Sequence, residues 1–113
     1  PKQYSWQEPL WLSGSHIDSV PTGGKFDGVV GIVAPLEVLR TKPTAPLELI
    51  IFAEEEGTTF NLGMLGSRAW VGTLSAQQLS EVRNKLGQNY WQAGANYGAS
   101  AERLASEQLQ PES

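Results

Sequence analysis

The chain has 113 residues, of which 40% are hydrophobic, so it can form a packed core as one domain or as part of one. Its formal net charge of −4 argues against a nucleic-acid-binding protein, because such proteins usually present a basic surface. It contains no cysteine, which excludes disulfide bonds, zinc–thiolate sites and a thiol nucleophile. No apolar run approaches the roughly 20 residues of a membrane-spanning helix, and no signal peptide is visible. We therefore expect a cytoplasmic protein that binds neither nucleic acid nor membrane.

After a predicted lead-in loop over residues 1–9, the first element is a buried strand that ends at the only histidine of the chain. A short apolar run, Leu10–Leu12, leads into Ser13–His16. In open α/β sheets, ligands bind outside the carboxyl ends of the strands, so His16 stands where a ligand site is expected. Asp18 follows two residues later and could hold the far ring nitrogen of a metal-bound histidine.

A helix and a second strand complete a predicted βαβ unit. The apolar density of residues 29–40 favours a buried helix, with Asp27 at the position of an N-cap acid. Pro35 lies inside this helix and should kink it or delay its start, because proline lacks a backbone N–H. Residues 47–53 form the clearest predicted strand, which is short, apolar and β-branched at its centre.

Three glutamates, Glu54, Glu55 and Glu56, follow the second predicted strand directly. Strand, helix and strand in this order imply parallel strands with a right-handed crossover. The carboxyl ends of both strands then lie at the same edge of the sheet. We therefore expect His16 and these carboxylates to share that edge.

The C-terminal half is predicted to be mainly helical. Residues 67–71 suit a short helix or turn, and residues 76–86 suit a longer helix. Ser75 is its expected N-cap, with Gln78 at the capping-box position. Residues 100–109 suit a second amphipathic helix.

Each candidate ligand also has an ordinary structural interpretation. A single histidine on an apolar strand is usually a core residue, a run of three glutamates is usually a solvated surface, and Asp27 alone would be a helix cap. Glutamates at the mouth of a sheet, however, need a partner for their charge. The three signals together favour a metal site, in which imidazole and carboxylate ligands suit Zn, Mn, Co or Ni.

Four motifs carry a resemblance to a known family. They are Gly14-Ser15-His16-Ile17-Asp18-Ser19-Val20, Gly23-Gly24-Lys25-Phe26-Asp27-Gly28, Glu55-Glu56-Gly57-Thr58-Thr59-Phe60 and Leu65-Gly66-Ser67-Arg68-Ala69. Together they resemble the M20 metallopeptidase family, within the branch of N-carbamoyl-L-amino-acid hydrolases, allantoate amidohydrolases and β-ureidopropionases. The resemblance runs from about residue 10 to about residue 86.

The resemblance implies a fold and a set of site residues. The fold is α/β, part of a zinc-exopeptidase-like three-layer sandwich with a mostly parallel sheet that holds two divalent metal ions. His16 would bind one ion, Glu56 the other, and Asp27 would bridge both. Asp18 would orient His16, and Glu55 would be the general base. The implied reaction is hydrolysis of a linear amide or ureido C–N bond, as in an N-carbamoyl amino acid that releases ammonia and carbon dioxide.

The chain departs from the family pattern in its extent. The family supplies two further metal-binding histidines from later in the chain, and a separate lid domain that forms a homodimer. Residues 1–113 are therefore expected to be the N-terminal part of the catalytic metal-binding domain, without that lid domain. We expect the chain by itself to bind metal weakly and to turn over little or nothing.

Two other interpretations stay open at this stage. The chain could be a non-catalytic remnant that uses its exposed edges for association, as the missing ligands would allow. It could also be an M20 aminoacylase or peptidase, with an N-acyl amino acid or peptide as substrate. The motifs over residues 23–28 and 66–68 favour the carbamoyl branch over the second interpretation.

Overall fold

A computed structural model describes residues 11–109, so the predicted lead-in loop and Leu10 lie outside the described residues. The chain divides into two compact units that meet between residues 53 and 54. Residues 11–53 contain two strands and one helix, and we call them the βαβ unit. Residues 54–109 contain only helices and loops, and we call them the helical unit. Within the described residues, no helix has the length and apolar character needed to cross a membrane.

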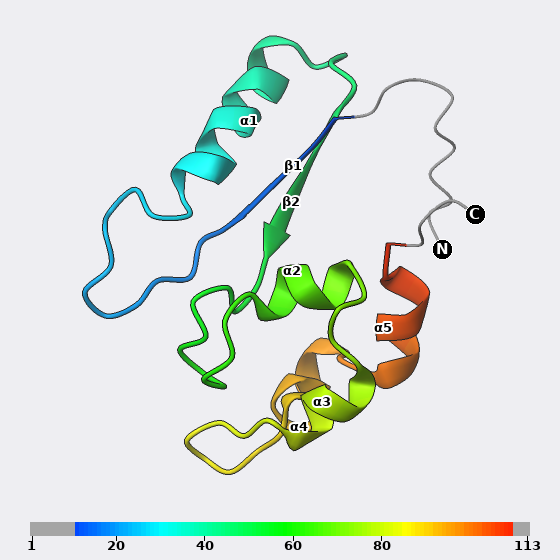
Figure 1. Ribbon diagram of the computed structural model, residues 1–113. Helices are drawn as coiled ribbons and strands as arrows, with labels where there is room; N and C mark the ends of the chain where they lie inside the picture. Colours follow the sequence, from blue (N-terminus) through cyan, green and yellow to red (C-terminus); the bar gives the residue numbers. More distant parts are fainter. Residues whose placement is uncertain (1–10, 110–113) are drawn as a thin grey trace. The chain divides into compact units, whose positions relative to one another are not determined.

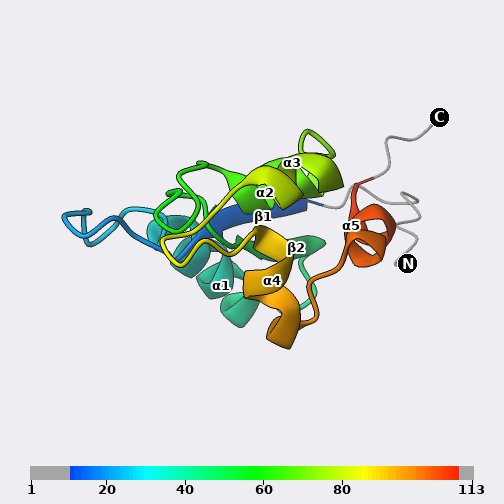
Figure 2. The same cartoon turned by 90° about the horizontal axis from the view of Figure 1, so that it is seen from below.

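The βαβ unit has the predicted order of elements, but the prediction of a buried first strand is wrong, because no residue of that strand is fully buried. Strand β1 covers Trp11–His16, helix α1 covers Val30–Thr41, and strand β2 covers Leu47–Phe52. The two strands pair in parallel, with Trp11 opposite Leu47 and His16 opposite Phe52 (Figure 1). Helix α1 lies along both strands (Figure 2). The α/β class and the parallel pairing predicted from the sequence are therefore confirmed.

The helix approaches β1 closely because small residues face each other. A Cβ atom added at Gly31 would lie 2.6 Å from the Ser15 side chain, so a larger residue would push α1 away from the strand. The Ser15 hydroxyl also donates a hydrogen bond of 2.8 Å to the carbonyl of Gly28, in the loop before α1. These contacts fix the start of the helix against the C-terminal end of β1.

The prediction that α1 is a buried helix is wrong. The helix is not buried: Ile32 and Pro35 are its buried residues, while Val30 and Val33 are 53% and 56% exposed. A two-stranded sheet covers one side of a helix only, and the apolar residues on its other side stay open. Of the two effects predicted for Pro35, a kink or a delayed start, the delayed start does not occur, because the helix begins at Val30, five residues before the proline.

The helical unit consists of short helices around a small core. Its elements are α2 (Leu65–Trp70), α3 (Ala76–Glu81), α4 (Tyr90–Gly94), the 3-10 turn η1 (Ala95–Tyr97) and α5 (Ala101–Glu107). The buried side chains of Phe60, Leu65, Leu74 and Leu79 form the core cluster. The predicted capping box of Ser75 and Gln78 is present at the start of α3, and Ser100 caps α5.

The predicted helix over residues 76–86 is too long, since α3 ends at Glu81. Val82 has extended backbone angles, and the Asn84 side-chain oxygen then accepts hydrogen bonds of 2.9 Å from the backbone N–H groups of Leu86 and Gln88. An asparagine that bonds its own backbone in this way competes with helix formation. Helix α4 was not predicted, although Asn89 and Gln92 form a second capping box at its start.

Candidate metal and acid–base site

His16 ends β1 with its ring orientation fixed by the backbone. Its side chain is 17% exposed, and Nδ1 lies 2.9 Å from the carbonyl oxygen of Asp18. A carbonyl oxygen only accepts, so Nδ1 must carry the proton in this contact and donate it. In neutral histidine the lone pair is then on Nε2, which is the atom available to bind a metal ion.

Asp18 contacts His16 in a different way from that predicted. Its carboxylate Oδ1 is 3.7 Å from His16 Nδ1, which is too long for a hydrogen bond but close enough for an ion pair with a protonated ring. The hydrogen bond itself comes from the Asp18 carbonyl. The main-chain geometry of residues 16–18 therefore sets the ring orientation, with the carboxylate beside it.

Gly28 forms the other wall of the His16 site. Its φ is +68°, and a Cβ added there would lie 2.6 Å from His16 Cε1 and 2.7 Å from Nδ1. Any larger residue would be strained in its backbone and would also collide with the imidazole ring. Gly28 is thus required both for the turn and for the close approach of the ring.

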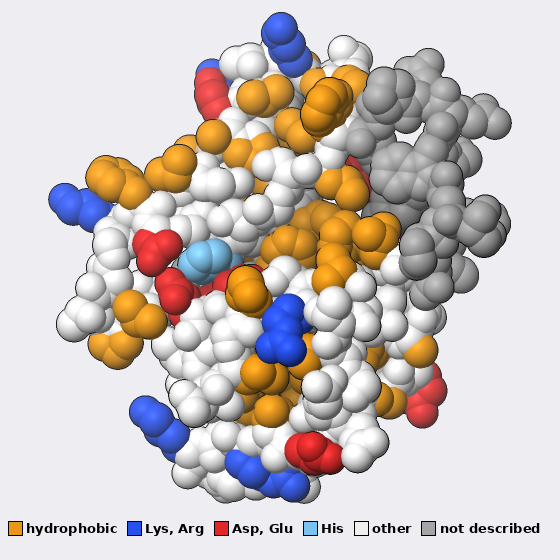
Figure 3. Space-filling model, viewed as in Figure 1, with side chains coloured by type: hydrophobic (Ala, Val, Ile, Leu, Met, Phe, Trp, Pro, Cys, Tyr) orange, Lys and Arg blue, Asp and Glu red, His pale blue; other side chains and the backbone are white. Residues whose placement is uncertain are grey.

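Asp27 precedes this glycine and lies exposed beside the histidine. One of its carboxylate oxygens and one ring nitrogen of His16 lie within 4.8 Å of each other. Acidic side chains gather next to the single histidine on the surface (Figure 3). The predicted N-cap role of Asp27 is wrong, because the N-cap of α1 is Val29 and no side chain caps that helix. The Asp27 carboxylate is therefore not committed to helix capping.

Glu54 opens the helical unit and has a structural role that the sequence did not reveal. Its Oε1 accepts hydrogen bonds from the backbone N–H groups of Thr59, at 2.5 Å, and Phe60, at 3.2 Å. Its own backbone has φ = +57°, which is uncommon outside glycine. Glu54 thus closes the loop that follows it, in a conformation that a sequence pattern does not show.

The same loop stores further backbone strain. Asn61 and Met64 also have positive φ values, of +53° and +55°. Gly57 has φ = +67°, and a Cβ there would lie 2.9 Å from the backbone of both Leu62 and Gly63. Such strain concentrates at functional sites, where the surrounding structure maintains it.

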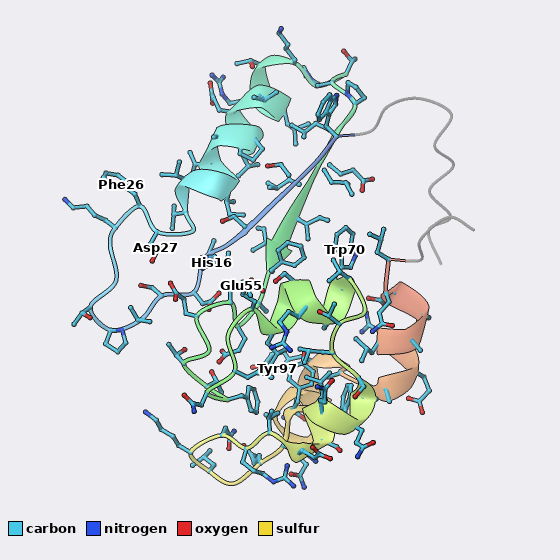
Figure 4. All side chains as sticks on the ribbon, viewed as in Figure 1. His16, Phe26, Asp27, Glu55, Trp70 and Tyr97 are labelled. Carbon is cyan, nitrogen blue, oxygen red and sulfur yellow. The ribbon has the colours of Figure 1, made fainter. Side chains whose placement is uncertain are left out.

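Glu55 is held at both carboxylate oxygens by one residue. The backbone N–H of Ser67 donates to Oε1 and the Ser67 hydroxyl donates to Oε2, each at 2.8 Å. Ser67 is the third residue of α2, beside which Figure 4 shows Glu55. Each carboxylate oxygen has a second lone pair, so Glu55 keeps the capacity to accept a proton.

The predicted site residues thus fall into two groups. His16, Asp18 and Asp27 lie together in the βαβ unit, and their donor atoms suit a divalent transition metal. Glu55 and the half-buried Glu56 lie in the first loop of the helical unit.

The helical unit also contains an apolar cavity of about 450 Å³. Trp70, Tyr90, Trp91 and Tyr97 contribute to its walls, and none of the predicted site residues lines it. Burial in this region raises the pKa of the Tyr90 hydroxyl above its usual value. The cavity is therefore a feature of the helical core, and it meets the loop that Glu54 closes only at Phe60.

Comparison with known proteins finds several similar hydrolases, while no protein-family profile matches. An uncharacterized hydrolase of Haemophilus influenzae is 44% identical over 96 residues, which are 80% of this chain and 23% of that protein. The N-carbamoyl-L-amino acid amidohydrolase of Geobacillus stearothermophilus is 40% identical over 106 residues, or 88% of this chain and 26% of the relative. The allantoate amidohydrolase of Bacillus subtilis is 37% identical over 82 residues, or 67% and 20%.

A solved structure gives the same result. The crystal structure of a hydantoinase/carbamoylase family amidase from Burkholderia ambifaria matches with a TM-score of 0.70 and 36% identity, over 82% of this chain and 24% of that one. The chain thus spans about a quarter of the length of the relatives that it matches.

Proposed function

This chain belongs to the hydrolase branch that contains N-carbamoyl-L-amino-acid amidohydrolases and allantoate amidohydrolase, and from that membership we propose that it carries part of a metal-dependent amidohydrolase site. The substrate class is a small molecule with a linear N-carbamoyl or ureido C–N bond. Its cofactor is a pair of divalent ions, chosen from Zn, Mn, Co and Ni. We expect the full-length enzyme to form a homodimer.

The proposed metal ligands in the βαβ unit are His16 and Asp27. The Nδ1–H contact with the Asp18 carbonyl leaves Nε2 of His16 as a ligand, and the Asp27 carboxylate has two oxygens that can bridge a pair of ions. Such ions supply polarisation of a carbonyl group and a water of lowered pKa when they are bound. The observation that carries the proposal is this histidine–aspartate pair at the carboxyl end of a parallel strand, in a chain with these relatives.

Glu56 is the proposed third ligand, and chain connectivity supports it. Phe52 lies opposite His16 in the sheet, and Glu56 follows Phe52 by four residues. A chain of four residues spans at most about 14 Å, which limits how far Glu56 can be from the end of β1. Within that limit, Glu56 is a candidate ligand of an ion that His16 binds.

Glu55 is the proposed general base. Ser67 fixes both of its oxygens, so the carboxylate can accept a proton from water with little reorganisation. The water oxygen attacks the ureido carbonyl carbon, the proton goes to Glu55, and the same proton then passes to the departing nitrogen as the C–N bond breaks. Asp18 takes no proton in this scheme and keeps the His16 ring in the required tautomer.

A metal titration of the chain tests the ligand assignment. We expect Zn²⁺ or Mn²⁺ affinity to fall by at least about tenfold in His16→Ala, since loss of a ligand costs more than loss of an outer contact. Glu81→Gln, at an exposed position of α3, removes a carboxylate that is not a proposed ligand and should have no effect. Equal affinity in His16→Ala and the unaltered chain would remove His16 from the site.

A chimera tests the catalytic role. This chain replaces the matching stretch of the Geobacillus enzyme, and hydrolysis of an N-carbamoyl-L-amino acid is measured. Glu55→Gln should lower kcat by at least about a hundredfold, in line with the contribution of general bases, and should leave the metal content unchanged. An unchanged rate in an active chimera would show that Glu55 is not the base.

A further inference from the structure

The pair Asp27-Gly28 differs from every other aspartate or asparagine of the chain in the residue that follows it. The side-chain carbonyl carbon of these residues lies close to the backbone nitrogen of the next residue, and attack by that nitrogen closes a cyclic imide. A side chain on the next residue hinders this approach, and glycine has none. The other aspartate, Asp18, precedes a serine, and the asparagines precede leucine, lysine or tyrosine: Asn61, Asn84, Asn89 and Asn96.

The structure leaves both reacting groups of this pair accessible. Asp27 is exposed, and its carboxylate caps no helix. The backbone N–H groups on either side are engaged, since that of Asp27 donates to the Gly24 carbonyl at 3.1 Å and that of Val29 donates to the Asp27 carbonyl at 2.7 Å. Between residues 11 and 109, by contrast, no acceptor receives a hydrogen bond from the Gly28 N–H. The Gly28 nitrogen is therefore not committed to the fold.

The peptide group between Asp27 and Gly28 can also turn without unfolding of its surroundings. Within the described residues, a single hydrogen bond holds it, the one that its carbonyl accepts from Val29. The next carbonyl, that of Gly28, stays anchored by the Ser15 hydroxyl at 2.8 Å and by the Gly31 N–H at 3.0 Å. Glycine adopts positive and negative φ values about equally well, so Gly28 can absorb the rotation. The nitrogen can then approach the side chain while the start of α1 stays in place.

We propose that Asp27 is a site of spontaneous isomerisation to isoaspartate. The reaction starts from the protonated carboxyl group, which takes its proton from solvent. The Gly28 nitrogen forms a bond to Asp27 Cγ, and the nitrogen proton and the Cγ hydroxyl leave together as one water molecule. A water molecule then adds to the cyclic imide and breaks one of its two ring C–N bonds. Opening at Cγ restores aspartate, whereas opening at the backbone carbonyl carbon gives isoaspartate, and no oxidant or other reactant is consumed.

Isomerisation changes the geometry of the candidate metal site. In isoaspartate the main chain passes through Cβ and Cγ of residue 27, and the former backbone carbonyl carbon becomes the free carboxylate. The loop before α1 is then longer, and the carboxylate is attached directly to Cα. This consequence rests on the proposed function, in which the Asp27 carboxylate binds metal beside His16. A chain with isoaspartate at residue 27 should therefore lose metal affinity.

The test is incubation of the folded chain at neutral pH in heavy-oxygen water, followed by digestion in ordinary water and peptide mapping by mass spectrometry. Each opening of the imide leaves one heavy oxygen atom at residue 27, and fragment ions distinguish isoaspartate from aspartate. We expect at least about tenfold more label at Asp27 than at Asp18, a difference of about 1.4 kcal/mol in activation free energy. Asp27→Glu keeps a carboxylate but has to close a larger ring, so it should take up no label.

A parallel sample in urea separates the effect of the fold from that of the sequence. Label that appears at residue 27 in urea but not in the folded chain would overturn the proposal, because the fold would then protect this pair. Equal labelling of Asp18 and Asp27 would also overturn it, since the glycine would then have no influence.

A zinc titration of the separated isoaspartate form tests the consequence for the site. The isoaspartate form should bind Zn²⁺ more weakly than the unaltered chain. Unchanged affinity would refute the assignment of Asp27 as a metal ligand and would leave the modification site standing. Absence of label in the folded chain, together with normal zinc binding, would refute the modification site alone.

Discussion

The two units of this chain hold their candidate site residues by different means. The helical unit has a core cluster of four buried side chains, and Leu65 in that core opens the helix that carries Ser67. In the described residues of the βαβ unit, only Ile32 and Pro35 of α1 are buried. Its His16 is held by a backbone carbonyl and by the close approach of a glycine.

This difference shows which changes each half of the site will tolerate. In the helical unit, the core positions α2, and α2 positions the Glu55 carboxylate through Ser67. A substitution in that core should therefore displace the carboxylate indirectly. In the βαβ unit, backbone atoms hold the His16 ring. A core substitution should therefore disturb the ring less than a Cβ atom added at Gly28. The candidate site residues thus depend on side-chain packing in the helical unit and on backbone geometry in the βαβ unit.

The largest expected effect is in the helical core. Leu65 is 1% exposed, so Leu65→Ala leaves a cavity and should cost about 2–5 kcal/mol of unfolding free energy. Hydrogen exchange measured residue by residue should show faster exchange across residues 54–109. Because α2 carries Ser67, the hydrogen bonds to Glu55 should weaken in the same variant.

Leu36→Ala in α1 is the matched control for this change. Leu36 is 49% exposed, and truncation of an exposed side chain is usually within about 0.5 kcal/mol of neutral. The contrast between the units would fail if Leu36→Ala cost as much as Leu65→Ala. It would also fail if Leu65→Ala left hydrogen exchange in the helical unit unchanged.

A glycine substitution tests the backbone-held half. Gly28→Ala combines a positive φ, which costs roughly 1–2 kcal/mol for a residue with a Cβ, with a collision against the His16 ring. Gly87→Ala has the same backbone cost at φ = +76° but no atom within 4 Å of the new Cβ. We expect both variants to lose stability and only Gly28→Ala to lose metal affinity, by about tenfold or more.

Calorimetric metal titration of both glycine variants provides the measurement. Equal metal affinity in the two would mean that the ring does not depend on this close approach. Loss of metal affinity in Gly87→Ala would instead show that general destabilisation, rather than ring displacement, explains the result at Gly28.

The sequence predicted the parts of the fold that local patterns determine. The strand predicted over residues 47–53 is present as β2 (Leu47–Phe52), although no residue of it is fully buried, and the capping signal of Ser75 with Gln78 is confirmed. The exposure of Val33 could not be predicted, because burial depends on which elements cover the helix. The end of α3 depends on the side chain of Asn84, which bonds the backbone beyond it.

The candidate site shows a similar division. The motif residues His16, Asp27 and Glu55 were identified from the sequence, and their roles remain predictions. The contacts of Glu54 and Ser67 were not identified, because they arise from positive φ values and from the return of a loop onto a helix. Spacing along the chain does not contain that information.

A smaller effect is expected at the serine that holds Glu55. Ser67→Ala removes the hydroxyl bond of 2.8 Å and keeps the backbone bond, so it should cost on the order of 1 kcal/mol in urea unfolding. Ser67→Thr retains the hydroxyl and should restore most of this loss. Ser80→Ala, which removes a hydroxyl bonded only to the carbonyl of Gln77, should be nearly neutral.

The Ser67 variants also test whether a side chain positions the candidate catalytic group in the helical unit, in contrast to the backbone contacts that position His16 in the βαβ unit. In the active chimera, Ser67→Ala should lower kcat while KM stays nearly constant, if Ser67 acts through the hydrogen bonds that it donates to Glu55. A change in KM alone would show that Ser67 acts on the substrate rather than on Glu55.

The smallest expected effect is a pH dependence confined to the helical unit. Burial raises the pKa of Tyr90, whose ring packs 5.7 Å from Phe60 and 5.3 Å from Trp91 between ring centres. Below about pH 10 the hydroxyl is protonated in both the folded and the unfolded chain, and its stabilising contribution is fully present. Above that pH the unfolded chain ionises first, so the folded state loses stability as the pH rises through the folded pKa.

Urea unfolding of Tyr90→Phe at several alkaline pH values measures this contribution. The variant cannot ionise at this position, so its stability should fall less steeply above about pH 10 than that of the unaltered chain. Tyr97→Phe, at a ring that is 88% exposed, is the control and should follow the unaltered chain. Identical pH profiles for Tyr90→Phe and the unaltered chain would mean that the aromatic cluster does not shield this hydroxyl, and the helical core would then be looser than its packing indicates.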